Sequence, residues 1–359
     1  MTVHDLPAAK VLIHASQFPE KVRRDLVESL RTRRVNHKFH YDSVRQTLKW
    51  LALHQEYSPT RNDADCRAVY TQAFKAAAEK IKTPRVHVVG LGCGGGQKDT
   101  QLLKLLKARG RAIFYTPCDV SAAMVLVARR TALAVLPQKN CFPFVCDLAT
   151  ADDLPVTLAC RSEAKTARLF TFFGMIPNFE PQIILPRLAS LIRPKDFLLF
   201  SANLATGNNY AAGMKKILPQ YDNLLTRDWL MTFLLDLGVE KKDGELRFKI
   251  EICSSRREEA QTSRSISPKK NQRLLTSSPT MEEVELKRVV ADFRFTRPRR
   301  IEIDDERFNF RSGETIQLFF SYRYTPELVH KLLGRYDLEV CDQWIAKSEE
   351  EGVFLCRRK

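Results

Sequence analysis

The sequence of 359 residues lacks the patterns of membrane and secreted proteins. No run of about 18 apolar residues occurs, so we expect no segment that crosses a membrane. Residues 1–5 do not begin a basic and then apolar stretch of the kind that opens a secretory signal. None of the nine cysteines forms a Cys-x-x-Cys pair. These absences disfavour a disulfide framework and a zinc site, and they predict a reduced, cytoplasmic protein with buried thiols.

Acidic residues are outnumbered by basic ones. The chain carries 58 Lys and Arg against 42 Asp and Glu, a formal net charge of +16. A basic protein gains affinity for nucleic acid by neutralising phosphates, so a nucleic-acid partner is one interpretation. The other is a solvated basic surface that favours small anionic ligands. Hydrophobic residues make up 44% of the chain, which is enough for one large domain or two modest ones.

Strands and helices alternate from residue 86 onward. Short apolar runs predict strands over 86–89, 112–117, 141–146, 168–173 and 196–201, and helical periodicity covers 99–109 and 121–133. This alternation predicts an α/β fold with a parallel, doubly wound, Rossmann-like sheet. Further helices are expected upstream, over 19–34, 44–54 and about 60–80.

The alternation breaks after residue 201. Residues 202–250 are predicted as helices, and 254–283, rich in Ser, Arg, Lys and Gln, as a mobile loop. Alternating apolar residues then predict strands over 289–295, 299–303 and 314–321. A helix over 326–334 and a hairpin of strands 338–345 and 353–357 are expected to close the sheet.

A glycine-rich loop, Gly90 to Gly96, lies between the first predicted strand and a helix. Glycines allow the backbone to approach a ligand closely, and the start of a helix directs free N–H groups at negative charge. The loop alone fits a dinucleotide, a phosphate or a simple turn. No Gly-Lys-Ser/Thr follows, which disfavours a nucleoside triphosphate.

Carboxylates follow the next two predicted strands. Asp119 lies 27 residues after Gly92, where a carboxylate can accept both ribose hydroxyls of an adenosine. Asp147 follows the third strand and can accept the adenine amino group while Leu148 packs on the ring. Alternatively, Asp119 caps the next helix and Asp147 is an ordinary loop residue. Taken with the glycines, the pair favours a cofactor that contains adenosine.

Several motifs occur in the order found in one known family. They are KFHYD at 38–42, EYSPTR at 56–61, LGCG at 91–94 with Lys98, YTPCDVS at 115–121, FGMIPNF at 173–179, QYDN at 220–223 and FSYRY at 320–324. From about residue 36 to the end, the chain resembles the histidine Nα-methyltransferase family of ergothioneine biosynthesis.

The resemblance implies a methyltransferase that acts on the α-amino group of an amino acid and has two domains. Residues 62–201 and 325–359 would bind S-adenosylmethionine, and residues 1–61 and 202–324 would form an α+β domain that covers the substrate. Cofactor contacts are expected from Tyr41, Gly92, Lys98, Asp119, Asp147 and Leu148. The catalytic, substrate-holding residues are expected to be Tyr57, Asn178 and Tyr221.

Two departures from the family pattern concern the cofactor and the substrate. Gly90 occupies a position that is usually acidic in the family. The family recognises imidazole with a glutamate and a serine two residues apart; Ser321 matches the serine, but Phe319 replaces the glutamate. A site built around a hydrogen bond discriminates strongly against ligands that lack it. We therefore expect a substrate that is histidine-like or, given Phe319, aromatic or apolar, such as a tryptophan derivative.

Two other functions compete with amino-acid methylation. An RNA or DNA methyltransferase would suit the charge, but enzymes that methylate a base amine often carry Asn/Asp-Pro-Pro-aromatic after the fourth strand. Residues 175–179 read MIPNF instead. A non-catalytic relative that only binds the cofactor is the third interpretation. His37 and His40 are spaced three apart, but no further ligand cluster lies nearby, so no metal is expected.

Overall fold

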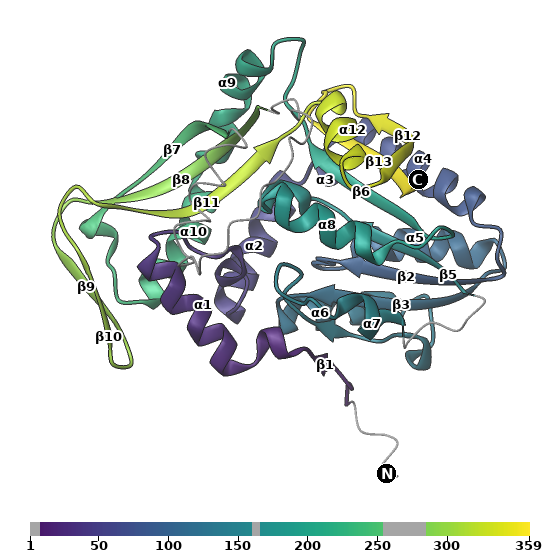
Figure 1. The fold of residues 1–359 in the computed structure, drawn as a ribbon, viewed down its shortest axis with the longest axis horizontal. Coiled ribbons are helices and arrows are strands. Elements are labelled where there is room, and N and C mark those ends of the chain that lie inside the picture. Colours follow the sequence, from purple (N-terminus) through teal and green to yellow (C-terminus); the bar gives the residue numbers. More distant parts are fainter. Residues whose placement is uncertain (1–7, 160–165, 254–284) are drawn as a thin grey trace, which may run out of the picture.

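The computed structural model describes residues 8–159, 166–253 and 285–359, and the loop predicted over 254–283 lies outside them. Two sheets dominate the view in Figure 1, a large one with helices on both faces and a smaller one beside it. The large sheet has the order β1-β4-β3-β2-β5-β6-β13-β12. Its strands are β1 Leu12–Ile13, β2 Arg85–Leu91, β3 Ala112–Asp119, β4 Phe144–Val145, β5 Ala167–Phe172, β6 Phe197–Asn203, β12 Leu338–Ile345 and β13 Glu351–Arg358.

The order of this sheet confirms the predicted Rossmann-like α/β fold. Strands β4, β3, β2, β5 and β6 pair in parallel, and the antiparallel β13 joins β6. The chain runs from β2 outward through β3 to β4 and then returns to β5 on the other side. Strand order therefore reverses at β2, which makes its carboxyl end the expected place for a ligand.

Helices cover both faces of the large sheet because its central strands are buried on both sides. Val86 and Val88 of β2 face a core formed with α4 and α5, whereas Val89 and Leu91 face a core formed with α7, α8 and α12. These helices are α4 Ala64–Lys80, α5 Gln97–Ala108, α6 Ala122–Ala132, α7 Leu154–Ala159, α8 Pro181–Leu191 and α12 Pro326–Gly334. Ser121 caps α6, as predicted, by accepting the N–H of Met124.

The smaller sheet has the order β11-β8-β7 and carries the hairpin β9–β10 at one end (Figure 1). Its strands are β7 Gly244–Cys253, β8 Leu286–Phe295, β9 Arg299–Ile303, β10 Glu306–Phe310 and β11 Thr315–Arg323. Helices α1 Pro19–Arg31, α2 Val44–Tyr57, α3 Pro59–Asn62, α9 Tyr210–Tyr221 and α10 Leu224–Asp236 accompany it. The short 3-10 helices are η2 Ala15–Gln17, η3 His37–His40, η4 Gln138–Asn140, η5 Ile176–Asn178 and η6 Lys241–Asp243.

The structure differs from the predicted elements at three places. Residues 202–250 were predicted as helices, but Gly244–Cys253 is strand β7, because its apolar side chains alternate with charged ones along a half-exposed strand. The strand predicted over 141–146 shrinks to Phe144–Val145. Strand β1, which the sequence did not indicate, pairs in parallel with β4, so Leu12 and Ile13 join the large sheet.

A buried ion pair stabilises the turn that enters β6. Arg168 of β5 and Asp196 are 2% and 4% exposed. The guanidinium donates to Asp196 through Nε at 2.9 Å and Nη2 at 2.5 Å, and Nη2 also donates to the Leu191 carbonyl oxygen at 2.7 Å. Among the helices of the described ranges, none combines the length and apolar character that crossing a bilayer requires.

Candidate functional site

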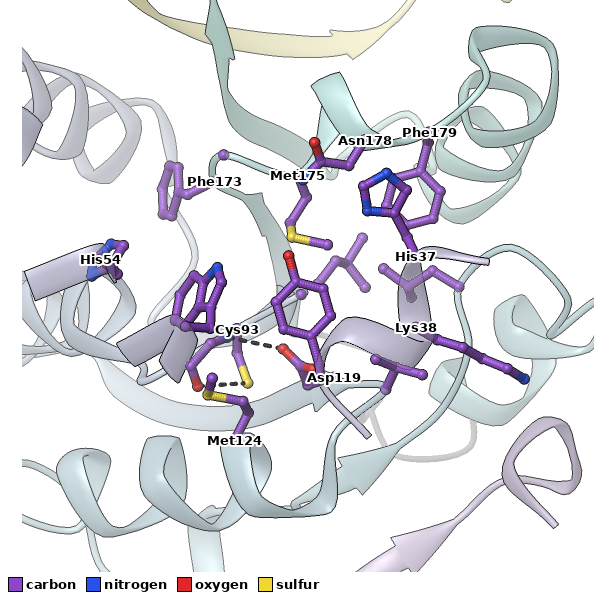
Figure 2. A pocket seen from close by; sticks show the side chains of 18 of the residues that line it. His37, Lys38, His54, Cys93, Asp119, Met124, Phe173, Met175, Asn178 and Phe179 are labelled. Atoms are coloured by element: carbon purple, nitrogen blue, oxygen red, sulfur yellow. Dashed lines mark hydrogen bonds between the residues drawn. The ribbon is translucent and has the colours of Figure 1, made fainter. Parts of the chain in front are cut away.

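A cavity of about 920 Å³ opens at the carboxyl ends of β2, β3 and β5, where the strand order reverses. This volume is at the upper end of the range for small-molecule sites, about 300–1,000 Å³. In Figure 2 Asp119 points into it from one side, and Met175 and Asn178 face it from the other. All six predicted cofactor contacts line this cavity.

The glycine loop forms the floor of the cavity at the end of β2. Gly92 and Gly94 have φ values of 60° and 49°, a region that L-residues with side chains rarely adopt. A Cβ on Gly92 would lie 2.6 Å from Cγ of Met175, so a side chain there would close the space. The loop therefore needs glycine to leave room for a ligand.

Asp119, at the end of β3, holds the loop in place. Its Oδ2 accepts the N–H of Gly94 and its Oδ1 accepts the N–H of Ser121, each at 3.0 Å. Burial raises the pKa of this carboxyl, whereas the backbone N–H donors lower it. The buried hydroxyl of Tyr41 lies in the same cavity, and its pKa is raised by burial and by the charge of Asp119.

Asp147 presents an unused acceptor to the cavity. Its Oδ1 accepts the N–H of Ala149 at 2.9 Å. Its Oδ2 is buried and accepts no hydrogen bond from the described part of the chain, although Nζ of Lys38 lies 3.7 Å away. Leu148 beside it is 6% exposed and lines the same wall. A buried acceptor next to an apolar side chain fits an adenine, which offers an amino group beside a flat ring.

Lys98 lies at the opposite end of the cavity. Its Nζ donates to the Tyr70 hydroxyl at 2.7 Å, and that hydroxyl donates to Glu351 at 2.5 Å. Burial lowers the pKa of Lys98, and the charge of Glu351 opposes this effect. A cation held by a neutral hydroxyl can still bind a ligand carboxylate.

The predicted acceptor residues divide into two groups. Tyr57, at the end of α2, and Asn178, in η5, line the cavity. Tyr221, Phe319 and Ser321 are not among its lining residues. The Tyr221 hydroxyl donates to Oγ of Ser321 at 3.0 Å and accepts from Nε of Arg323 at 3.1 Å. Phe319 is 7% exposed and packs on Trp229 and His37.

His37 is a cavity residue that sequence reasoning considered only as a metal ligand. Its Nε2–H donates to the Phe320 carbonyl oxygen at 3.1 Å. In the neutral ring Nδ1 is then an acceptor, and this atom is buried without a partner in the described structure. Among the residues that the structure describes, no group of three His, Cys, Asp or Glu side chains could hold a metal ion. No sequence pattern indicates His37 as a hydrogen-bond acceptor, because its role depends on β11 packing beside it.

Acidification is expected to destabilise the protein through His37 and His40. Burial, aided at His37 by the neighbouring His40, lowers the pKa of His37 to about 3 and that of His40 to about 4, from 6.5. The unfolded chain therefore binds these protons first. Above pH 6.5 both histidines are neutral in the folded and the unfolded chain, and the protein keeps its full stability. As the pH falls below 6.5 stability is lost, until the pH reaches about 4 for His40 and about 3 for His37. Between pH 7 and pH 5 the two histidines together are expected to lower the free energy of unfolding by about 4 kcal/mol. Urea unfolding at the two pH values measures this loss.

The matched control for this pH dependence is the double variant His37→Gln/His40→Gln. Glutamine keeps a donor for each carbonyl but does not titrate. Its stability should change clearly less between pH 7 and pH 5 than that of the wild type. An equal loss in both proteins would contradict the assignment to these two histidines.

A glycine loop, a carboxylate after each of the next two strands and a cavity at the reversal of strand order are typical of a site for a cofactor that contains adenosine. The model of a family described as "Histidine-specific methyltransferase, SAM-dependent" matches residues 21–212 and 281–358. The chain belongs to this family, and its cofactor is S-adenosylmethionine. A comparison with curated proteins finds no match.

Solved methyltransferase structures are similar over much of the chain but at low identity. The magnesium protoporphyrin IX methyltransferase of Synechocystis PCC 6803, with bound SAH, is 12% identical with a TM-score of 0.44, covering 90% of this chain and 98% of that one. The CcbJ methyltransferase of Streptomyces caelestis is 10% identical with a TM-score of 0.40, covering 81% and 95%.

Proposed function

We propose that this methyltransferase transfers a methyl group to the α-amino group of a small amino acid with an aromatic side chain. The observation that carries the proposal is that one cavity contains both the predicted cofactor contacts and the acceptor residues Tyr57 and Asn178. Donor and acceptor molecules could therefore meet without crossing a barrier of protein. A volume of about 920 Å³ leaves room for a second small molecule beside the cofactor.

The cofactor is proposed to lie along the strand ends. Adenine would pack on Leu148 and donate its amino group to Oδ2 of Asp147, the buried acceptor without a hydrogen bond. Ribose hydroxyls would donate to Asp119, beneath Tyr41, and the cofactor carboxylate would reach Lys98. When bound, S-adenosylmethionine supplies an electrophilic methyl group on a sulfonium centre.

The acceptor side offers groups suited to an amino acid. The hydroxyl of Tyr57 and the amide of Asn178 can bind the amine and carboxylate without adding charge. Arg61 and Arg67 also line the cavity and would favour a carboxylate. The role of Tyr221, whose hydroxyl already bonds Ser321 and Arg323, is proposed to be the support of this wall.

Aromatic rings favour an aromatic acceptor. Phe173, Phe179 and Phe320 line the cavity, and Phe319 packs on His37 from behind with ring centroids 5.0 Å apart. Apolar rings of this kind bind other rings through burial and edge-to-face contacts. The free Nδ1 of His37 adds one acceptor for an N–H of the bound molecule, such as an ammonium or a ring N–H.

Methyl transfer needs a neutral amine, an in-line approach and little water. Burial disfavours the ammonium form and so helps the amine lose its proton. His37 is neutral at physiological pH, because burial lowers its pKa to about 3, and therefore adds no repulsion. Tyr57 and Asn178 would fix the direction of the amine, and such positioning lowers the barrier by reducing the entropy lost on reaching the transition state.

Asn178→Ala is expected to raise KM for the amino acid about tenfold, because one or two hydrogen bonds of about 1 kcal/mol each are lost. The same variant should bind S-adenosylhomocysteine as the wild type does in calorimetry. Tyr57→Phe, which removes one hydroxyl, should give a smaller increase in KM. Equal losses of amino-acid and cofactor binding would contradict the placement of Asn178 on the acceptor side.

The proposed function is tested by incubation with methyl-labelled cofactor and separate pools of the twenty amino acids, indole and imidazole derivatives, and RNA. Label is expected in an aromatic amino acid. A thermal-shift screen of the same compounds with S-adenosylhomocysteine present should select the same one. Label in RNA alone would overturn the proposal, and stabilisation by histidine alone would overturn the aromatic preference drawn from Phe319.

A further inference from the structure

The space above Gly90 is filled by the side chain of another residue. Gly90, the first residue of the predicted glycine loop, is the second-last residue of β2. A Cβ built on it would overlap Oδ2 of Asp99 and lie 3.2 Å from the Tyr115 hydroxyl oxygen. Asp99 belongs to the first turn of α5, on the other side of the loop. The absence of a side chain at residue 90 therefore lets a carboxylate from α5 reach the end of β2.

Asp99 is a buried carboxylate that receives only neutral donors. It is 3% exposed, its Oδ2 accepts the Tyr115 hydroxyl at 2.6 Å and its Oδ1 accepts the Thr171 hydroxyl at 2.7 Å. No ion pair within 4.0 Å joins it to a cation in the described residues. Two hydroxyl donors leave lone pairs on both oxygens. A charge that is buried without a counter-charge is costly, unless a cation binds to it.

The same carboxylate borders the cavity. Asp99 and Thr171 both line it, together with Gly92 and Lys98. Burial raises the pKa of Asp99, while the hydroxyls and the charge of Lys98 lower it. The carboxyl group of Asp99 is thus held in place at the wall of a ligand site, beside Lys98 in the chain.

Strand order indicates which part of the cofactor lies there. In the proposed placement of the cofactor, the adenine lies at Asp147, after β4, and the ribose lies at Asp119, on β3. Because the sheet runs β4-β3-β2-β5, the rest of an extended cofactor continues across the glycine loop toward β5. Thr171 is on β5 and holds Asp99. The amino-acid part of the cofactor would therefore end beside Asp99 and Lys98.

We propose that Asp99 binds the α-ammonium group of the cofactor, and that Gly90 is required because it vacates the space through which Asp99 does so. This inference rests on the cofactor placement of the proposed function and not on the identity of the acceptor. The carboxylate of Asp99 would bind the ammonium group of the cofactor's amino-acid part, and Nζ of Lys98 would bind its carboxylate group.

The test compares two ligands on one variant by calorimetry. Asp99→Asn keeps the shape and an acceptor oxygen but removes the charge. Its affinity for S-adenosylhomocysteine should fall about 30-fold, the effect of one charge-assisted hydrogen bond. Its affinity for 5′-methylthioadenosine, which has no amino-acid part, should stay within about threefold. Loss of both affinities to the same extent, or of neither, would overturn the proposal.

Three comparisons make the test independent of folding and of the acceptor. Asp119→Asn should weaken the binding of both S-adenosylhomocysteine and 5′-methylthioadenosine, since both contain the ribose. The wild type should bind a deaminated analogue of S-adenosylhomocysteine about 30-fold more weakly than S-adenosylhomocysteine itself, and equal binding would overturn the proposal without any mutation. In the double variant Gly90→Asp/Asp99→Thr, the carboxylate would occupy the same space from β2 and not from α5. Affinity within about threefold of the wild type supports the shared space, and affinity as low as in Asp99→Thr alone contradicts it.

Discussion

Asp119→Asn is expected to raise the dissociation constant of S-adenosylmethionine about 100-fold. The carboxylate accepts backbone N–H groups from Gly94 and Ser121 and retains lone pairs toward the cavity. An asparagine NH2 cannot accept the bond at one of these positions, so the glycine loop and the ribose both lose a charged acceptor. Two weakened charge-assisted bonds amount to about 3 kcal/mol. Isothermal titration calorimetry measures the change directly.

The control for this variant is Asp342→Asn. Asp342 lies on the surface, where it pairs with Lys80 at 2.9 Å, and it does not line the cavity. Its replacement should leave cofactor affinity within about twofold of the wild type. A change of less than about threefold in Asp119→Asn would remove Asp119 from the set of cofactor contacts.

Arg168→Met is expected to lower the free energy of unfolding by about 3–5 kcal/mol, the cost of leaving one member of a buried ion pair without its partner. Asp196 would remain 4% exposed in the native state and keep only backbone donors, the N–H groups of Arg168 and Arg193. The Leu191 carbonyl oxygen would also lose its guanidinium donor. Urea unfolding followed by circular dichroism measures the effect.

A surface pair provides the comparison for this stability prediction. Arg300 and Glu302 form an ion pair with both side chains about half exposed, 48% and 53%. Exposed pairs contribute about 1 kcal/mol or less, so Arg300→Met should change stability by no more than that. Equal losses in the two variants would show that burial of the Arg168 pair does not matter.

The part of the cavity wall that is proposed to hold the cofactor could be located from sequence because its geometry is local. In a parallel sheet the carboxyl ends of neighbouring strands meet at one edge, so residues just beyond β2, β3 and β4 had to converge. Gly92, Asp119 and Asp147 needed only correct strand assignment. Each then lay in the cavity wall as expected.

The acceptor half depended on details that periodicity does not reveal. Strand β11 shifts register against β8 between Gln317 and Phe319, and such a bulge changes which side chains face a given side. Leu318 and Phe319 are both buried as a result, and Phe320 lines the cavity in their place. The expectations for Phe319 and Ser321 came from their positions in the family motif, which do not show how this strand packs. His37 and Asp99 were missed because their roles arise from contacts with segments far away in the chain.

The beginning of the chain connects two properties of the protein that are usually separate. Strand β1 covers the edge of the large sheet at β4, where an open edge would invite pairing with another chain. Immediately after it, Oγ of Ser16 accepts the N–H of Asp147 at 2.9 Å. The arm that shields the sheet thus also positions the proposed adenine acceptor. Because linked equilibria are reciprocal, any change that releases β1 and Ser16 from the large sheet should weaken cofactor binding. Conversely, a bound cofactor should hold this segment in place.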